Sequence, residues 1–143
     1  MEHLFVYGSL LFPELVTALT GKSFFYSPFI LNGFKRYRVR GCDYPAIVEE
    51  TESKAEGLLI ENVDKNSMEI LTFFEGEEYQ KQQITVFNSV KKEITAATFV
   101  WIADKNLLEN REWSAIEFKR KLLDYYLNEI VPETLVAFRS LNS

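Results

Sequence analysis

Short segments in which apolar and polar residues alternate fill the first two thirds of the chain. Alternation with a period of two is typical of strands, and glycine, proline and asparagine mark the turns between them. The pattern predicts six or seven short strands, at residues 3–7, 24–31, 34–39, 44–49, 55–61, 84–87 and 93–101. Asn32-Gly33 is a strong signal for a two-residue hairpin between the second and third of them.

Apolar residues spaced three and four apart predict a few helices, most of them late in the chain. The first covers residues 12–20, and the second begins at the N-cap Asp64 and runs to about residue 74. Ser114 and Glu117 have the spacing of a capping box and open the longest helix, which we expect to reach about residue 130. Pro132 is expected to stop or restart it, leaving a short helix at residues 135–138.

Many strands with few helices favour an α+β fold with a curled or barrel-like sheet over a doubly wound parallel sheet. No repeat or flexible linker divides residues 1–143, so we expect one domain. Hydrophobic residues make up 47% of the chain, which is enough for a sizeable core.

Charge and cysteine content narrow the class of protein. A net charge of −5 argues against a nucleic-acid-binding surface, which needs a concentrated basic face. A basic run alternates with Phe34, Tyr37 and Val39, which favours solvated or substrate-facing charge; its members are Lys35, Arg36, Arg38 and Arg40. The single Cys42 cannot form an intrachain disulfide, the first residues do not resemble a signal peptide, and no apolar run is long enough to span a membrane. We therefore expect a cytoplasmic location and no membrane partner.

The most informative segment is Tyr7, Gly8, Ser9 and Leu10, here called the 7–10 loop, which connects the first strand to the first helix. Gly8 can adopt backbone angles closed to other residues, so consecutive N–H groups can turn toward one point. Pro13 suits the first turn of a helix, whose free amides favour an anion. The segment predicts a cradle for a carboxylate or phosphate, although such junctions often have no chemical role.

A second candidate is Glu75, which ends an apolar helix just before Gly76. Desolvation by Phe73 or Phe74 would raise its pKa and make it a usable proton shuttle. The alternative is a surface carboxylate at a helix end. Glu77 and Glu78 fit the solvated rim of a turn better than a metal site, because other oxygen ligands are not in view.

Together these motifs resemble the γ-glutamylcyclotransferase-like superfamily, and most closely its AIG2-like branch. The resemblance lies in segments 5–13, 37–39, 44–48, 74–79 and 99–101, with the late helix after Trp113. It implies a small mixed β-barrel flanked by helices, with a pocket between the 7–10 loop and Glu75.

The same resemblance implies the activity and the site. A γ-glutamyl compound would be the small-molecule substrate, and attack of its α-amino group on the γ-carbonyl would release 5-oxoproline and an amine. Glu75 would be the catalytic acid/base, with substrate contacts from Tyr7, Gly8, Ser9, Leu10 and Tyr79. No cofactor or metal is expected, and the protein would act as a monomer or homodimer.

Two residues depart from the family pattern: Thr72 stands where an aspartate is common, and Lys81 where an arginine is common. Both could affect how the acid is oriented. The alternative function is a non-catalytic module that binds a small carboxylate on the same fold. The sequence leaves open whether the leaving group is an amino acid, an amine or a conjugated lysine.

Overall fold

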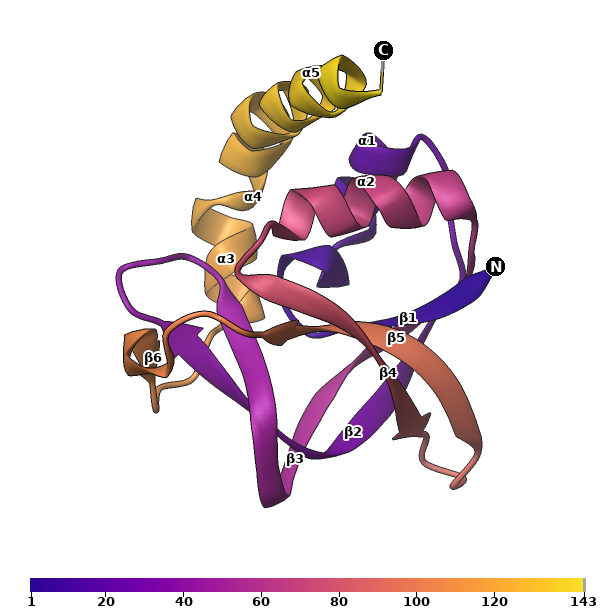
Figure 1. The fold of residues 1–143 in the computed structure, drawn as a ribbon, viewed down its shortest axis with the longest axis vertical. Helices are drawn as coiled ribbons and strands as arrows, with labels where there is room; N and C mark the ends of the chain where they lie inside the picture. The colour runs from indigo at the N-terminus through magenta and orange to yellow at the C-terminus, as the bar shows by residue number, and fades with distance from the viewer. Residues whose placement is uncertain (143) are drawn as a thin grey trace.

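Five strands close into a mixed β-barrel in the computed structural model, which describes residues 1–142 (Figure 1). Around the barrel the order is β3-β1-β5-β4-β2, and β2 pairs with β3 to close it. The β1–β5 pair is parallel and the others are antiparallel. A short β6 pairs with the end of β2. The strands are β1 (Glu2–Val6), β2 (Tyr26–Val39), β3 (Pro45–Val63), β4 (Tyr79–Phe87), β5 (Glu93–Trp101) and β6 (Leu108–Glu109). The expected barrel is thus confirmed.

The predicted hairpin at Asn32-Gly33 is wrong, because β2 continues through it as one strand of 14 residues. Asn32 pairs with Lys54 and Phe34 pairs with Glu49, so residues 50–53 bulge out opposite Gly33. Gly33 has a φ of +82°, which fits a bulge as well as a turn. The chain does not reverse there because both flanks of β2 pair with the same strand. For the same reason segments 44–49 and 55–61 are parts of one strand, β3.

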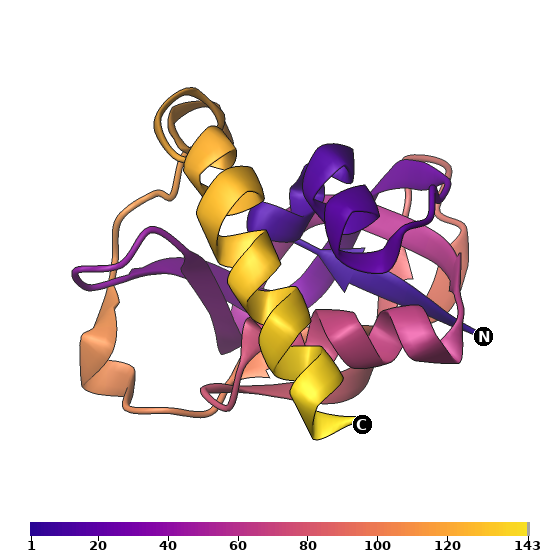
Figure 2. The ribbon, with the colours of Figure 1, turned by 90° about the horizontal axis from the view of Figure 1, so that it is seen from above.

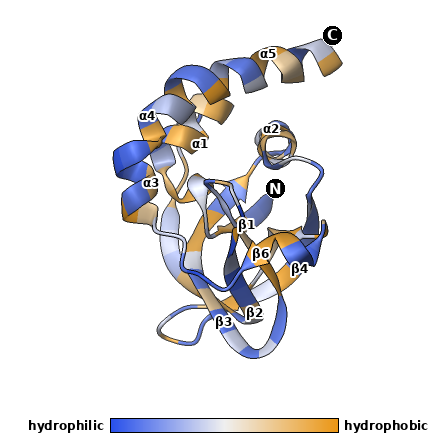
Figure 3. Cartoon of the chain, turned by 90° about the vertical axis from the view of Figure 1, so that its left-hand side faces the viewer, coloured by the Kyte–Doolittle hydropathy of each residue, from blue (hydrophilic) through white to orange (hydrophobic). Residues whose placement is uncertain are grey.

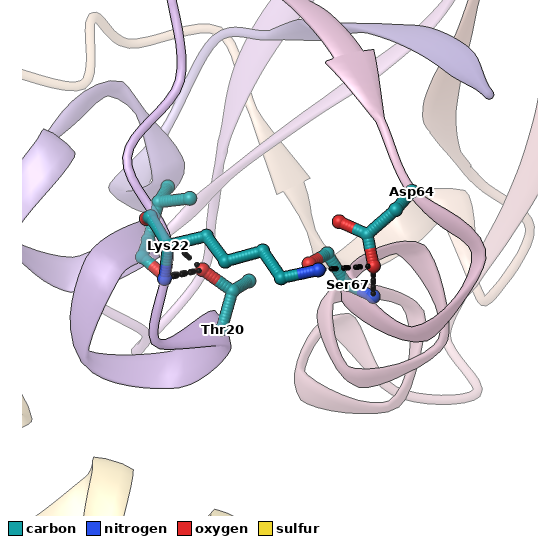
Figure 4. A network of polar contacts seen from close by, with 5 residues as sticks. Thr20, Lys22, Asp64 and Ser67 are labelled. Carbon is teal, nitrogen blue, oxygen red and sulfur yellow. Dashed lines mark hydrogen bonds and ion pairs between the residues drawn. The ribbon is translucent and has the colours of Figure 1, made fainter.

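The first two helices lie close to their predicted positions. A 3₁₀ turn (Ser9–Leu11) leads into α1 (Pro13–Thr20), and α2 spans Lys65–Glu75. The carboxylate of Asp64 accepts a hydrogen bond from the Ser67 N–H at 3.2 Å and lies 3.0 Å from Lys22 Nζ (Figure 4). Asp64 therefore caps α2 and also ties it to the residues that follow α1.

The late helix is longer and less regular than predicted. It consists of α3 (Ala115–Lys121), α4 (Leu123–Tyr125), a π turn (Tyr126–Ile130) and α5 (Val131–Leu141). Of the two outcomes predicted at Pro132, a stop is wrong and a restart is confirmed, because α5 begins at Val131 with Pro132 in its first turn. Proline is tolerated in the first turn of α5, and the π turn just before it widens the helix where proline has no N–H to donate. The short helix expected at residues 135–138 is part of α5.

Apolar residues form two clusters, one inside the barrel and one between the barrel and the helices. Phe5, Tyr7 and Ile47 belong to the cluster inside the barrel. Leu4, Leu71 and Phe118 belong to the cluster between the strands and the helices. The C-terminal helix crosses over α2 (Figure 2), and apolar and polar segments alternate along the helices above the strands (Figure 3). Within residues 1–142, the helices lack the length and apolar character required to cross a bilayer.

Candidate functional site

Tyr7, the first residue after β1, is held by hydrogen bonds of both its side-chain hydroxyl and its backbone carbonyl. Its hydroxyl donates a hydrogen bond to the Phe99 carbonyl on β5 at 2.5 Å. Its own carbonyl accepts a hydrogen bond from Arg36 Nη1 on β2 at 3.0 Å. The side chain lies in the apolar cluster inside the barrel. These contacts hold the start of the 7–10 loop between two strands on different sides of the barrel.

The sequence-based reason for Gly8 is wrong, although the requirement for glycine stands. Gly8 has a φ of −134°, outside the left-handed region. A Cβ at this position would instead lie 2.9 Å from the Pro45 ring, which is too close. Gly8 is therefore needed because β3 approaches the loop.

The amides of the 7–10 loop are available to a ligand. The N–H groups of Leu11 and Phe12 donate to the carbonyls of Gly8 and Ser9. By contrast, the N–H groups of Gly8, Ser9 and Leu10 are paired with no acceptor among residues 1–142. All three residues line the inner cavity, and successive amides without a protein acceptor are what a site for an oxyanion or a carboxylate requires.

Glu75 occupies the last position of α2, and Gly76 turns the chain away with a φ of +89°. Burial raises the pKa of this carboxyl group to about 8. No basic side chain or hydrogen-bond donor among the described residues pairs with it. At neutral pH the protonated form therefore predominates, as expected for an acid in an apolar setting without a counter-ion.

Two cavities meet at Glu75. The inner one, of about 20 Å³, has room for roughly one water molecule, and the outer one has about 240 Å³. Both are lined by Ser9, Tyr44, Glu75 and Tyr79. The inner cavity brings together every residue that the sequence proposed for the site: Tyr7, Gly8, Ser9, Leu10, Glu75 and Tyr79.

Several tyrosine hydroxyls lie near the acid, in addition to the side chains of Ser9 and Thr134 that line the same cavities. The Tyr79 hydroxyl donates to the Pro45 carbonyl at 2.7 Å, and the Tyr44 hydroxyl donates to Glu78 at 3.4 Å. Burial is the main cause that raises the pKa of Tyr7 and of Tyr79, and the proximity of Glu75 adds to it. Burial also raises the pKa of Tyr126 to about 12. These phenols remain neutral at physiological pH. The single O–H groups of Tyr7 and Tyr79 already donate to backbone carbonyls, so toward a ligand their oxygens can only accept.

The residues of the late helix that line the outer cavity were not identified from the sequence. Tyr126, Ile130 and Thr134 of the late helix face the outer cavity together with Phe74 and Tyr44. Their spacing of four residues places them on one helical face, but this pattern does not distinguish a cavity wall from a core. The predicted break at Pro132 also concealed that Ile130 and Thr134 belong to one continuous helical segment.

Thr72 and Lys81, the two departures from the family pattern, form no side-chain hydrogen bond or ion pair with Glu75. The Thr72 hydroxyl donates to the Met68 carbonyl at 2.7 Å, and Lys81 Nζ lies 2.7 Å from a carboxylate oxygen of Glu2. Both residues line a different cavity beside β1 and α2. Glu77 and Glu78 are exposed, and residues 1–142 contain no group of three His, Cys, Asp or Glu side chains placed to hold a metal ion.

Comparison with known proteins gives consistent matches. Residues 4–115 match the family model described as gamma-glutamyl cyclotransferase, AIG2-like. Two Arabidopsis thaliana relatives, Protein AIG2 C and AIG2-like protein C, are 27% identical over 119 residues and 31% identical over 99 residues. These matches cover 82% of this chain and 72% of the first relative, and 68% of this chain and 58% of the second.

Solved structures agree with this assignment at the level of the fold. An Arabidopsis thaliana protein determined in solution superposes with a TM-score of 0.69 at 26% identity, over 90% of this chain and 87% of that one. A protein named gamma-glutamyl cyclotransferase superposes with a TM-score of 0.63 at 17% identity, over 90% of this chain and 86% of that one.

Proposed function

Since the chain belongs to the AIG2-like gamma-glutamyl cyclotransferase family, we propose that it is an enzyme that releases 5-oxoproline and a free amine from a γ-glutamyl compound. The observation that carries this proposal is the position of Glu75. It is an acid without a counter-ion, with its pKa raised to about 8, where the two cavities meet beside the free amides of the 7–10 loop. This acid is suited to exchange protons with an amine near neutral pH.

The proposed reaction is internal to the substrate. Ionised Glu75 takes a proton from the α-ammonium group, and the resulting amine attacks the γ-carbonyl carbon. The carbonyl oxygen becomes an oxyanion, which the N–H groups of Gly8, Ser9 and Leu10 stabilise. As the oxyanion collapses, the bond from the γ-carbon to the leaving nitrogen breaks, and protonated Glu75 gives its proton to that nitrogen. The ring nitrogen then loses its second proton to the ionised Glu75, which passes it to the departing amine, so that neutral lactam and an ammonium ion are formed.

Two features of the proposed site would accelerate the reaction. Closing a five-membered ring within one bound molecule removes the entropic cost of bringing two reactants together. An acid whose pKa is raised to about 8 is closer to the pKa of an amine than an ordinary carboxyl group is, so it can take up and return a proton at a smaller free-energy cost. We assign no step to a metal or organic cofactor.

The alternative is a module that binds a small carboxylate without turnover. The same three amides would hold such a ligand. A carboxylate beside the ligand is a disadvantage for a simple binder, because its ionised form repels the anion, whereas an enzyme of this type requires it. We therefore favour the enzyme, and on the single Cys42 we place it in the cytoplasm.

The test is 5-oxoproline release from three substrate classes: γ-glutamyl amino acids, γ-glutamylamines and γ-glutamyl-ε-lysine conjugates. We expect at least one class to yield stoichiometric 5-oxoproline and amine. Binding of 5-oxoproline without turnover of any class would instead support the binding module.

A further inference from the structure

A separate cavity of about 330 Å³ is lined by residues of β2, of β3 and of the segment that follows β6. Its charged lining comprises four basic residues, Lys35, Arg36, Lys54 and Arg111, and two acidic residues, Glu56 and Glu112. The lining thus carries a net charge of +2 in a chain whose net charge is −5. A local excess of positive charge in an acidic protein favours an anionic ligand over a cation.

Arg36 gives this cavity a preorganised donor. It pairs in register with Ile47, a residue of the apolar cluster inside the barrel, so its side chain lies on the inner face of β2. One N–H group of its guanidinium donates to the Tyr7 carbonyl, and no carboxylate among residues 1–142 forms an ion pair with it. A guanidinium has five N–H donors, so the others remain for an anion.

The other three basic residues of the lining form only long ion pairs with carboxylates of the protein, or none. Lys35 Nζ lies 3.8 Å from Glu50, and Arg111 Nη1 lies 3.7 Å from Glu109. Both distances exceed that of a hydrogen bond. Lys54 is exposed and forms no ion pair with another described residue. Lys54 and Arg111 can therefore turn toward a ligand at small cost. Lys35 directly precedes Arg36, so its side chain leaves the opposite face of β2, where its Nζ lies 5.1 Å from the centre of the Tyr37 ring, and it adds charge at the edge of the cavity.

We propose that this cavity binds the phosphate group of a small molecule, with Arg36 linking the bound anion to Tyr7. A phosphate carries close to two negative charges at neutral pH and matches the net charge of the lining. Guanidinium groups bind phosphate oxygens in pairs, which suits Arg36 and Arg111. Because Arg36 holds the Tyr7 carbonyl with one N–H, a phosphate on its free donors acts on the residue that begins the 7–10 loop.

Electrostatics around Tyr7 are consistent with this link. Burial and Glu75 raise the pKa of its hydroxyl, whereas Arg36 acts in the opposite direction. The pKa of the Tyr7 hydroxyl therefore depends on both Glu75 and Arg36. Binding at this cavity does not depend on the proposed reaction, so it is tested without any turnover.

The experiment is a titration of the full chain, labelled with ¹⁵N, with inorganic phosphate, followed by amide chemical shifts. A parallel titration with glycerol phosphate distinguishes a phosphate ester from free phosphate as the preferred source. We expect saturable shifts at residues 35–36, 54–56 and 110–112, with smaller shifts at Gly8 and Ser9. Acetate at the same ionic strength should give at least about tenfold weaker binding.

Three variants and a matched control complete the test. Arg36→Gln should weaken phosphate binding at least about tenfold, and Lys54→Gln and Arg111→Gln each about threefold. Lys119→Gln removes an exposed lysine of α3 that forms no ion pair with another described residue and should leave the affinity unchanged. Lys54 and Arg111 are exposed, so their substitution should not disturb folding. These two variants therefore test the proposal even if Arg36→Gln does not fold. Absence of saturable shifts, or equal affinity in Arg111→Gln, Lys54→Gln and wild type, overturns the proposal.

Discussion

The cavities at Glu75 and at Arg36 are both connected to Tyr7 but differ in charge: the first is close to neutral at pH 7, and the lining of the second has a net charge of +2. At Glu75 a single acid and several tyrosines face a partly apolar space without any basic side chain in the lining. At Arg36 four basic residues face a polar space. The difference shows that burial controls the charge of the first cavity and composition controls that of the second. Glu75 is largely neutral at pH 7 because it is desolvated, whereas the second lining is positive because its basic residues outnumber its acidic ones.

The largest expected effect comes from removing the acid. Glu75→Gln keeps the size of the side chain but cannot accept a proton, so 5-oxoproline release should fall at least about 100-fold. The matched control is Glu77→Gln, which changes an exposed carboxylate two residues away and should leave the rate within about twofold. The measurement is the initial rate at saturating substrate, with circular dichroism to verify folding. Near-wild-type turnover by Glu75→Gln would remove this residue from the mechanism.

The raised pKa of Glu75 also predicts how stability depends on pH. Its folded-state pKa is about 8 and its ordinary value is 4.5, so between these pH values the native state holds a proton that the unfolded state releases. Unfolding free energy should therefore fall as pH rises from about 5 to 8. Each pKa unit corresponds to about 1.4 kcal/mol, and partial exposure of the side chain brings the expected loss to about 3 kcal/mol.

Denaturant titrations at several pH values check this stability effect without any substrate. Glu75→Gln should flatten the decline, while Glu77→Gln should retain it. A decline of the same size in Glu75→Gln and in wild type would show that another group is responsible.

The rate should depend on pH in the opposite direction from stability. Ionised Glu75 is the form that takes the α-ammonium proton, so activity should rise about tenfold per pH unit from pH 6 and level off above about 8. Prior treatment with EDTA should leave this profile unchanged. Loss of activity on chelation, restored by a divalent ion, would contradict a reaction without metal.

A smaller effect is expected from the loop. Gly8→Ala adds a methyl group that would lie 2.9 Å from the Pro45 ring, so the loop must move away from β3. Displaced amides should weaken the binding of 5-oxoproline about tenfold, with a modest loss of stability from overpacking. Calorimetric titration measures the first effect and thermal unfolding the second. Unchanged affinity in a folded variant would place the cradle elsewhere.

The sequence was sufficient to predict the local features of the acidic cavity. Asp64 and Gly76 mark the ends of α2, and so the helix-end position of Glu75 followed from short-range signals. The 7–10 loop was identified in the same way from its place between a strand and a helix. The reason for Gly8 was missed, since the approach of Pro45 depends on a contact between residues 37 positions apart in the chain.

Long-range pairing explains the other failures. Asn32-Gly33 has the composition of a hairpin, and only its pairing with β3 on both flanks makes it a bulge. Arg36 belongs to a basic run that predicted solvated or substrate-facing charge, and the contact with the Tyr7 carbonyl depends on how the barrel closes. Pro132 is a helix breaker by composition, but the π turn before it accommodates the ring.

The late helix has a consequence for how this protein could diverge. The acid and the loop belong to the part of the chain that carries the family pattern, which ends at residue 115. Tyr126, Ile130 and Thr134, which form one wall of the outer cavity, lie beyond it. In the proposed reaction, substitutions on this helical face would change which leaving groups fit while Glu75 is inherited unchanged. Selection on substrate range and selection on the proposed chemistry would then act on separate segments of the gene.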